Sequence, residues 1–242
     1  MDQATIADAI ARHERIAFQL SGGRDSVAAL FAMRSHWDRM YVYHLDTGDR
    51  FPETARVIDE IAGLVPIITI ESDVKTYRET AGYASDVVPV DNTPFGRMVS
   101  GDRPRIVSRY DCCGAVVMLP LYQRMDSDGI TLIVRGQRCS DYARAPIRSG
   151  QSDGRFEVLF PIEDWSDQQV DQFIAENGLP VTDFYKRGLS VTPECAGCTA
   201  WWGEGRLQYL QESDPVTYDQ VSKKIIEIRQ EIGAQLQPIL AI

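Results

Sequence analysis

The chain has 242 residues, with 25 Lys and Arg against 35 Asp and Glu, which gives a formal net charge of −10 and a pI of about 4.8. This acidic balance argues against direct binding of nucleic acid as the main task, because such proteins need a clustered cationic face. With 44% hydrophobic and 25% charged residues, the composition is typical of an ordinary globular protein and excludes disorder, collagen and repeat arrays.

The first twenty residues contain charged side chains and no continuous apolar stretch, so we expect neither a signal peptide nor a membrane anchor, and a cytoplasmic protein. The number of cysteines is odd, and they are clustered rather than spread as a disulfide framework would be. In a reducing compartment this pattern indicates a metal site or catalysis. The cysteines are Cys112, Cys113, Cys139, Cys195 and Cys198.

Strands and helices are predicted to alternate along the chain. Apolar runs of strand length occupy residues 15–20, 40–45, 65–70 and 130–135. Helices are predicted at residues 3–13 and 27–33, from Pro52, after a cap at Ser72 or Asp73, and at 112–125, 165–177 and 218–235. This alternation predicts an α/β fold, a parallel twisted sheet with helices on both faces. Polar, Pro- and Gly-rich residues predict loops at 81–109 and 141–158. We expect a single domain over 1–242, with a small cluster-binding and helical C-terminal segment from about residue 204.

A glycine turn joins the first strand to the next helix, in the sequence Ser21-Gly22-Gly23-Arg24-Asp25-Ser26. Glycines let the backbone approach an anion, while the amides and the helix N-terminus point toward it. The spacing differs from that of kinase-type phosphate loops and of dinucleotide folds. The turn therefore predicts a phosphate-like ligand; the alternative is a turn that only joins the two elements, with Asp25 as a helix-start residue.

This hexapeptide resembles the S-G-G-x-D-S signature of the PP-loop superfamily, which has the adenine nucleotide α-hydrolase-like fold and whose members act at an α-phosphate. The segment from Leu45 to Thr54 resembles L-D-T-G-x-x-x-P-E-T of the adenylyl-sulfate and phosphoadenylyl-sulfate reductases. The resemblance implies an adenine-nucleotide ligand: ATP, adenylyl sulfate or phosphoadenylyl sulfate. It also implies nucleotide contacts from Ser21, Gly22, Gly23, Arg24, Asp25, Ser26, Asp46, Thr47 and Gly48.

Two cysteine pairs, Cys112-Cys113 and Cys195-x-x-Cys198, suit a structural zinc ion or an iron–sulfur cluster. Neighbouring side chains on a helix diverge by about 100°, which favours a cluster with several irons over one zinc ion. Zinc and buried free thiols stay open as alternatives. The arrangement resembles the C-C…C-x-x-C ligands of a 4Fe-4S cluster in bacterial adenylyl-sulfate reductases, and this resemblance implies that these four cysteines are ligands. Trp201 and Trp202 are expected to shield the cluster; the alternative is that they stack on the nucleotide base.

Further segments resemble the same reductases in the same order, so that the likeness extends from about residue 15 to 203. They are Gly136-Gln137-Arg138 with Asp141, residues 160–170, and residues 185–199. The resemblance implies that Gly136, Gln137, Arg138 and Lys186 also contact the nucleotide. We expect arginines around this site to reverse the overall negative charge locally. The candidate cations are Arg24, Arg50, Arg103, Arg105, Arg109, Arg135, Arg138, Arg144 and Lys186.

The chain departs from the reductases at two points. Their nucleophilic cysteine lies in a C-terminal E-C-G-[IL]-H motif, whereas no cysteine follows Cys198 in these 242 residues. Reduction of the usual type, through a thiolate intermediate, is therefore not expected. In addition, Cys139 replaces the second arginine of their G-Q-R-R segment. It is either an inert small residue or a nucleophile or persulfide carrier whose pKa Arg138 and Arg144 would lower.

Three hypotheses follow. The first is an enzyme that cleaves ATP to AMP and pyrophosphate with Mg²⁺, so that an adenylated substrate accepts sulfur from a donor protein; Asp25 and Arg138 would be catalytic, and Cys139 the candidate thiol. The second is a reductase in which Cys139, or a thiol of a thioredoxin-like partner, replaces the missing nucleophile. The third is a non-catalytic nucleotide-binding or redox-sensing subunit. Packing or homo-oligomerisation through the C-terminal helix stays open.

Overall fold

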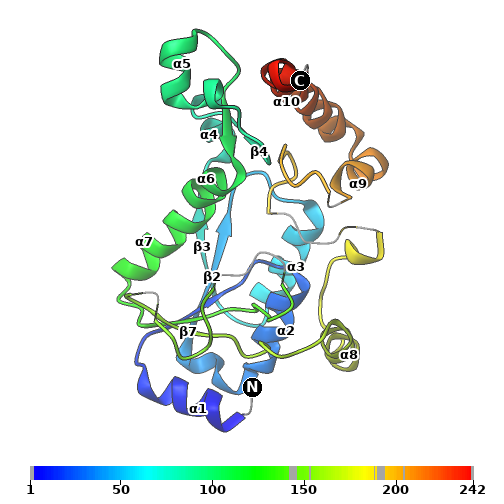
Figure 1. Ribbon diagram of the computed structural model, residues 1–242. Helices are drawn as coiled ribbons and strands as arrows, with labels where there is room; N and C mark the ends of the chain where they lie inside the picture. The colour runs from blue at the N-terminus through cyan, green and yellow to red at the C-terminus, as the bar shows by residue number, and fades with distance from the viewer. Residues whose placement is uncertain are drawn as a thin grey trace. The chain divides into compact units, whose positions relative to one another are not determined.

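The computed structural model describes residues 3–141, 146–152, 154–187, 189, 194–203 and 205–240 (Figure 1). The chain falls into two compact units. Unit 1 comprises Met1–Asp46, Pro52–Glu71 and Leu121–Asp183; unit 2 comprises Thr47–Phe51, Ser72–Pro120 and Phe184–Ile242. The expected single domain over 1–242 stays a prediction. Within the described ranges, no helix combines the length and the apolar character that crossing a bilayer requires.

Unit 1 contains a five-stranded sheet in the order β3-β2-β1-β6-β7, and every neighbouring pair is parallel. This confirms the predicted α/β class. The strands are β1 (Ile16–Gln19), β2 (Met40–Asp46), β3 (Ile67–Glu71), β6 (Leu132–Val134) and β7 (Glu157–Leu159). The central strand β1 is apolar without alternation because both of its faces are covered, and Ile16, Ala17 and Phe18 are fully buried.

Helices lie on both sides of this sheet (Figure 1). They are α1 (Gln3–Arg12), α2 (Arg24–Ala32), the short 3₁₀-helix η1 (Arg34–Arg39), α3 (Pro52–Ala62), α7 (Leu119–Ser127) and α8 (Asp167–Asn177). The helix predicted at 165–177 is confirmed as α8. Ser166 and Gln169 form a capping box at its start, and Gly178 ends it in the left-handed conformation.

Unit 2 is mainly helical, with one parallel strand pair, β4 (Tyr83–Ser85) and β5 (Ile106–Ser108). Its first helix, α4 (Val74–Thr80), is capped by Asp73, which accepts a hydrogen bond from the Thr76 amide. Of the two predicted caps, Ser72 and Asp73, the structure therefore uses Asp73. The helical elements are α4 (Val74–Thr80), η2 (Val90–Asn92), α5 (Pro94–Ser100), α6 (Arg109–Cys113), the π-helical turn η3 (Gly114–Met118), η4 (Tyr185–Arg187), α9 (Arg206–Ser213) and α10 (Pro215–Leu240).

Three predicted boundaries were wrong. Residues 81–109 are not a loop, because Thr93 caps α5 and Pro94 opens it, while β4 and β5 pair with each other. The helix predicted at 112–125 begins earlier, since Ser108 caps α6, and a π-helical turn interrupts it. The predicted loop at 141–158 includes the first residues of β7, which pairs with β6.

Candidate functional site

The glycine turn lies between the end of β1 and the start of α2, as predicted. Gly22 has φ +82°, and a Cβ atom there would lie 2.9 Å from Thr54 Cγ2. Gly136 lets its own backbone lie directly against the backbone of Asp25, since a Cβ atom on Gly136 would lie 2.5 Å from the Asp25 backbone oxygen. The structure therefore brings together two predicted segments of unit 1, the turn and Gly136, by backbone contact that a side chain would block.

The two serines of the turn hold its shape. The Ser21 hydroxyl donates to Ser26 Oγ at 3.0 Å, and the Ser26 hydroxyl donates to the Gly23 carbonyl at 2.9 Å. The Gly23 amide donates to Ser21 Oγ at 3.3 Å. The turn is thus closed by its own hydroxyls at the N-terminus of a nine-residue helix, α2. First-turn amides of a helix lack partners within the helix, which makes this end suitable for an anion.

Arg138 is buried beside the turn and is surrounded by carboxylates. Its Nη2 lies 2.9 Å from Asp167 Oδ1, 3.1 Å from Asp25 Oδ2 and 3.6 Å from Asp141 Oδ1. Its backbone amide also donates to Asp141 Oδ2 at 2.8 Å. The motif residues Asp25, Arg138 and Asp141 therefore form one contiguous ion cluster, although they come from two distant segments.

Arg24 extends the same ion cluster. Its guanidinium contacts Asp167 Oδ1 at 2.5 Å and Asp171 Oδ1 at 2.9 Å. Among the described residues, the ion pairs of this cluster join two arginines, Arg24 and Arg138, to four aspartates, a net charge of −2 for these six side chains when all are ionised. The expected local excess of positive charge is not found at these two arginines. Asp167 and Asp171 were not predicted, because an acid in the first turn of a helix, as Asp167 is, needs no further explanation, and Asp171 one turn later belongs to no motif.

Burial raises the pKa of the Asp25 carboxyl above its ordinary value, against the opposing influence of the Arg138 and Arg24 charges. For Asp167, burial acts in the same direction, but the hydrogen bonds from Arg138 and Arg24 outweigh it and leave the pKa lowered. Asp25 Oδ1 is buried and accepts no hydrogen bond from any described residue, although Arg24 Nε lies 3.4 Å away. Within the described part of the chain, Asp25 Oδ1 therefore has an ion pair with Arg24 but no hydrogen bond, and keeps acceptor capacity.

Cys139 is exposed and also lies in unit 1, directly after Arg138. Arg148 Nη1 donates to its Sγ and to Glu163 Oε1, the latter at 3.0 Å. The Asp164 carboxylate lies 3.7 Å from the sulfur. Arg148 was not among the predicted cations, whereas the predicted neighbour Arg144 lies outside the described residues.

The remaining predicted nucleotide residues are divided between the units. Asp46 and Gln137 belong to unit 1; Thr47, Gly48 and Lys186 belong to unit 2. Asp46 is the last residue of β2, Gly48 has φ +72°, and Lys186 lies in η4. Thr47 is buried and accepts a hydrogen bond from the Cys195 thiol, at 3.5 Å between Oγ1 and Sγ. The segment after β2 therefore contacts a predicted cluster ligand.

All four predicted cluster ligands belong to unit 2. The Cys198 thiol is close enough to interact electrostatically with each of the other three thiols. Cys112, Cys195 and Cys198 pack among apolar side chains that include Val116 and Trp201. Burial raises the thiol pKa of Cys112 to about 11 and of Cys113 to about 12. No three His, Cys, Asp or Glu side chains of the described residues already converge as a preformed metal site.

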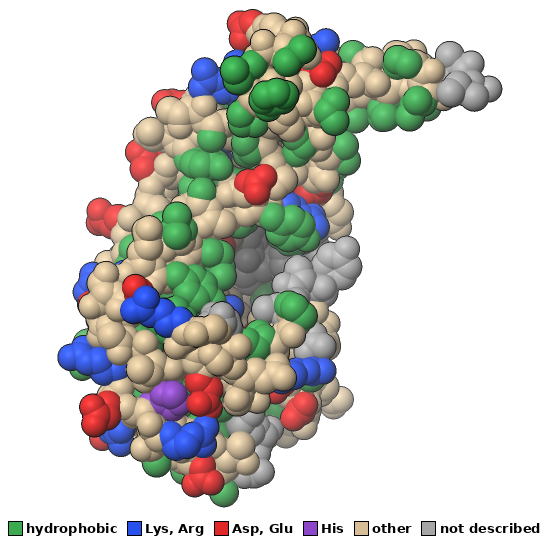
Figure 2. Space-filling model, turned by 60° about the vertical axis from the view of Figure 1, so that its left-hand side comes forward, with side chains coloured by type: hydrophobic (Ala, Val, Ile, Leu, Met, Phe, Trp, Pro, Cys, Tyr) green, Lys and Arg blue, Asp and Glu red, His purple; other side chains and the backbone are tan. Residues whose placement is uncertain are grey.

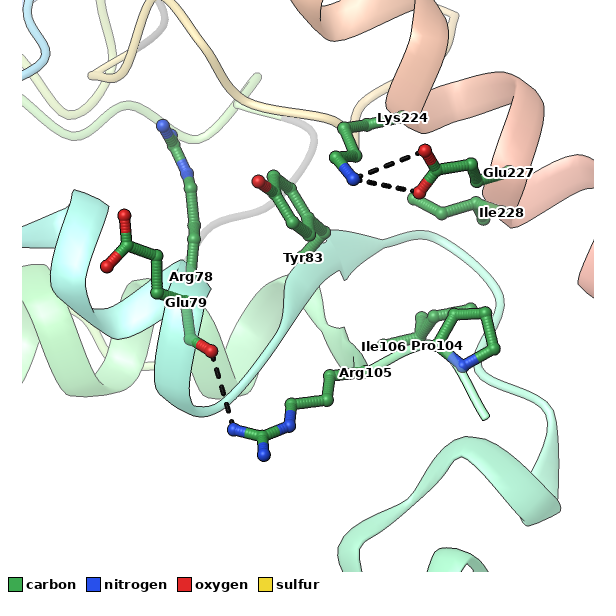
Figure 3. A pocket seen from close by; sticks show the side chains of 9 residues that line it. All are labelled: Arg78, Glu79, Tyr83, Pro104, Arg105, Ile106, Lys224, Glu227 and Ile228. Carbon is green, nitrogen blue, oxygen red and sulfur yellow. Dashed lines mark hydrogen bonds and ion pairs between the residues drawn. The ribbon is translucent and has the colours of Figure 1, made fainter. Parts of the chain in front are cut away.

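A pocket of unit 2 contains one of the predicted candidate cations, Arg105, and none of the predicted motif or cluster residues (Figure 3). Its lining residues are Arg78, Glu79, Tyr83, Pro104, Arg105, Ile106, Lys224, Glu227 and Ile228. On the face drawn in Figure 2, acidic and basic side chains alternate without forming a broad cationic field.

The comparisons with known proteins agree with this architecture. Residues 15–221 match the family model for the phosphoadenosine phosphosulfate reductase domain, and the chain belongs to this family. Adenosine 5'-phosphosulfate reductase of Rhizobium tropici is 25% identical over 66% of this chain and 89% of its own length. The Neisseria meningitidis protein of that name is 27% identical over 68% of each chain. A crystal structure of phosphoadenylyl-sulfate reductase from Candida auris, in a phosphate complex, shares the fold with a TM-score of 0.55 at 15% identity, over 79% of this chain and 86% of that one.

Proposed function

We propose that this chain binds ATP with Mg²⁺ at residues 21–26 and cleaves it between the α- and β-phosphates. A substrate oxyanion attacks the α-phosphorus, the bond to the bridging oxygen breaks, and pyrophosphate leaves with that electron pair. The products are an adenylated substrate and pyrophosphate. A sulfur donor then displaces AMP from the adenylated substrate, so that the complete sequence yields AMP.

The net negative ion cluster beside the turn carries this proposal. A triphosphate without a cation would be repelled by it, whereas Mg²⁺ combines one or two carboxylates with phosphate oxygens and water. Asp25 Oδ1 has the unfilled acceptor capacity that such an ion requires. Arg138 contacts the other oxygen of the same carboxylate at 3.1 Å and keeps it oriented. The amides of the turn and α2 would neutralise charge on the phosphate.

We assign Cys112, Cys113, Cys195 and Cys198 as ligands of a 4Fe-4S cluster. Four thiols of which Cys198 interacts electrostatically with each of the others, and three of which pack among apolar side chains, are a donor set that suits iron and sulfide. With four protein ligands such a cluster has no open coordination site, so it supplies rigidity and charge. Trp201 covers part of this apolar region, as expected for a residue that excludes solvent.

A reductase is the second candidate, and the exposed Cys139 thiol beside Arg148 favours it. The thiolate would attack the sulfur of adenylyl sulfate and release AMP, leaving an S-sulfocysteine. A thiol of a thioredoxin-like partner would then attack the cysteine sulfur, so that a mixed disulfide forms and sulfite leaves. A third candidate, a nucleotide-binding subunit without turnover, predicts binding and no product.

The experiment compares two substrates under anaerobic conditions, with Cys139→Ser beside the parent protein. ATP labelled at the α-phosphate is incubated with and without Mg²⁺ and with candidate acceptors, and labelled AMP, labelled adenylated acceptor and pyrophosphate are measured. Adenylyl sulfate is incubated with a thiol donor, and sulfite is measured. Mg²⁺-dependent release of pyrophosphate that survives Cys139→Ser supports the proposal. Sulfite formation that Cys139→Ser abolishes supports the reductase and contradicts the proposed cleavage of ATP.

A further inference from the structure

One residue, Asp49, binds two consecutive amides of the Cys195-x-x-Cys198 turn. Its backbone carbonyl accepts from the Ala196 amide at 2.6 Å, and its Oδ2 accepts from the Gly197 amide at 3.0 Å. Both contacts lie within unit 2. The backbone between the two predicted ligands is therefore fixed by a residue that is far away in the sequence and occupies an unspecified position of the motif at residues 45–54.

Arg78, on α4, completes this arrangement. Its guanidinium is buried and its Nη1 lies 2.5 Å from Asp49 Oδ2. A Cβ atom on Gly197 would lie 2.9 Å from both Arg78 Nη1 and Asp49 Oδ2, so the ion pair packs directly against the turn. Arg78 also interacts electrostatically with Cys112 and with Cys195.

We infer that Asp49 and Arg78 are positioning residues for the cysteine ligands. Asp49 fixes the backbone of the turn; Arg78 orients the Asp49 carboxylate and holds a positive charge beside the ligands. The inference rests on the cluster in the proposed function. Groups that orient metal ligands commonly change metal affinity by about 10- to 100-fold when they are removed. A buried pair is also sensitive to loss of one partner, because the other charge is then left uncompensated.

The molecule offers a matched control pair, Lys224 and Glu227 on α10, whose charged atoms lie 2.9 Å apart. Figure 3 shows both Lys224 and Arg78, each extending from its own helix. Lys224→Met and Glu227→Gln therefore remove the same kinds of charge from the same unit, without touching the cysteine turn.

The first measurement is the reduction potential of the loaded protein. Arg78→Met removes a positive charge and is expected to lower the potential, whereas Asp49→Asn removes a negative charge and is expected to raise it. Arg78→Lys keeps the charge and should stay near the parent value. If Arg78 and Asp49 had only a structural role, Arg78→Met and Asp49→Asn would shift the reduction potential in the same direction. Shifts of the same sign, or shifts no larger than those of the control pair, overturn the inference.

The second measurement separates this inference from the cluster itself. In iron-free protein, Asp49→Ala and Arg78→Met are expected to raise the rate of alkylation at Cys195 and Cys198 several-fold over Lys224→Met, with circular dichroism confirming a folded chain. Rates equal to the control overturn the positioning role. If anaerobically purified parent protein contains no iron and sulfide, the assignment of the 4Fe-4S cluster is wrong instead, and the electrostatic role of Arg78 fails with it.

Discussion

The glycine turn of unit 1, where we propose that phosphate binds, and the cysteine turn of unit 2 are built on opposite principles. The first depends on main-chain geometry and on charges that neutralise one another, Arg138 among three carboxylates. The second depends on thiols gathered in largely apolar surroundings, with Arg78 and Asp49 beside them. The two sites should therefore lose function in different ways: the glycine turn through added side-chain atoms or altered charge, and the cysteine turn through loss of any one proposed ligand.

Loss of a cysteine ligand should have the largest effect. Cys112→Ser is expected to abolish stoichiometric binding of iron and sulfide, because each ligand is needed to complete the set. Cys139→Ser is the matched control, since its exposed thiol lies in unit 1 and is not assigned to the cluster. Iron and acid-labile sulfide per chain are measured after anaerobic purification. Full iron content in Cys112→Ser would remove that residue from the ligand set.

The charge at the turn is tested by Asp25→Asn. We expect ATP cleavage to fall by about 10²- to 10³-fold, the loss typical of removing one group that stabilises charge at the reacting centre. Iron content should not change, because Asp25 lies in the other unit. Asp171→Asn is the control; this side chain is 60% exposed and contacts only Arg24 among the ion pairs described. Comparable cleavage rates in both variants would contradict the role of Asp25.

Main-chain geometry is tested by Gly136→Ala. The added methyl group would meet the backbone of Asp25, which must move, so nucleotide affinity should fall by about tenfold and stability by about 1–3 kcal/mol. Gly63→Ala is a suitable control, because its Cβ atom would lie 3.4 Å from the nearest atom outside its own neighbours, the Glu60 carbonyl oxygen. Binding is measured by calorimetry and stability by denaturant unfolding. Equal affinity in the two variants would show that the approach at Gly136 is not required.

A smaller effect is expected in the pH profile. Burial raises the pKa of Asp25, so the carboxylate is lost at a higher pH than for an exposed aspartate, whose pKa is about 4. The acidic limb of kcat/KM, which reports the free enzyme, should accordingly lie above that value. Arg138→Met removes a charge that lowers this pKa and should move the limb to still higher pH. A limb that Arg138→Met does not move would exclude Asp25 as its origin.

The fold and the first site were largely predictable because their signals are local. Apolar runs of strand length and the Gly22-Gly23 turn mark a strand, a turn and a helix in sequence, and β1 and α2 lie where these signals place them. The contact of Gly136 with the turn follows a family resemblance rather than any local pattern. The segment at 81–109 was wrongly read as a loop, because the pairing of β4 with β5 depends on contacts between residues more than twenty positions apart.

The partners of the predicted residues were not predictable. Asp167 reads as an ordinary first-turn acid of α8 and Asp171 as an ordinary surface acid one turn further on, and nothing in their spacing indicates that they pair with Arg24 and Arg138. Asp49 likewise has no motif of its own, and its role at the cysteine turn appears only when α4 and the turn are folded together. Motifs identify the candidate site residues, whereas tertiary contacts determine which of their charges are already neutralised by a partner and which can still bind a ligand.

The most direct test of the central claim is the release of pyrophosphate from ATP by the iron-loaded protein, with and without Mg²⁺, in the presence of an acceptor. The account predicts that pyrophosphate appears together with AMP or adenylated acceptor, only when Mg²⁺ is present, and that Asp25→Asn loses this activity while it retains iron. Release of sulfite from adenylyl sulfate, with no pyrophosphate from ATP under any of these conditions, would contradict it.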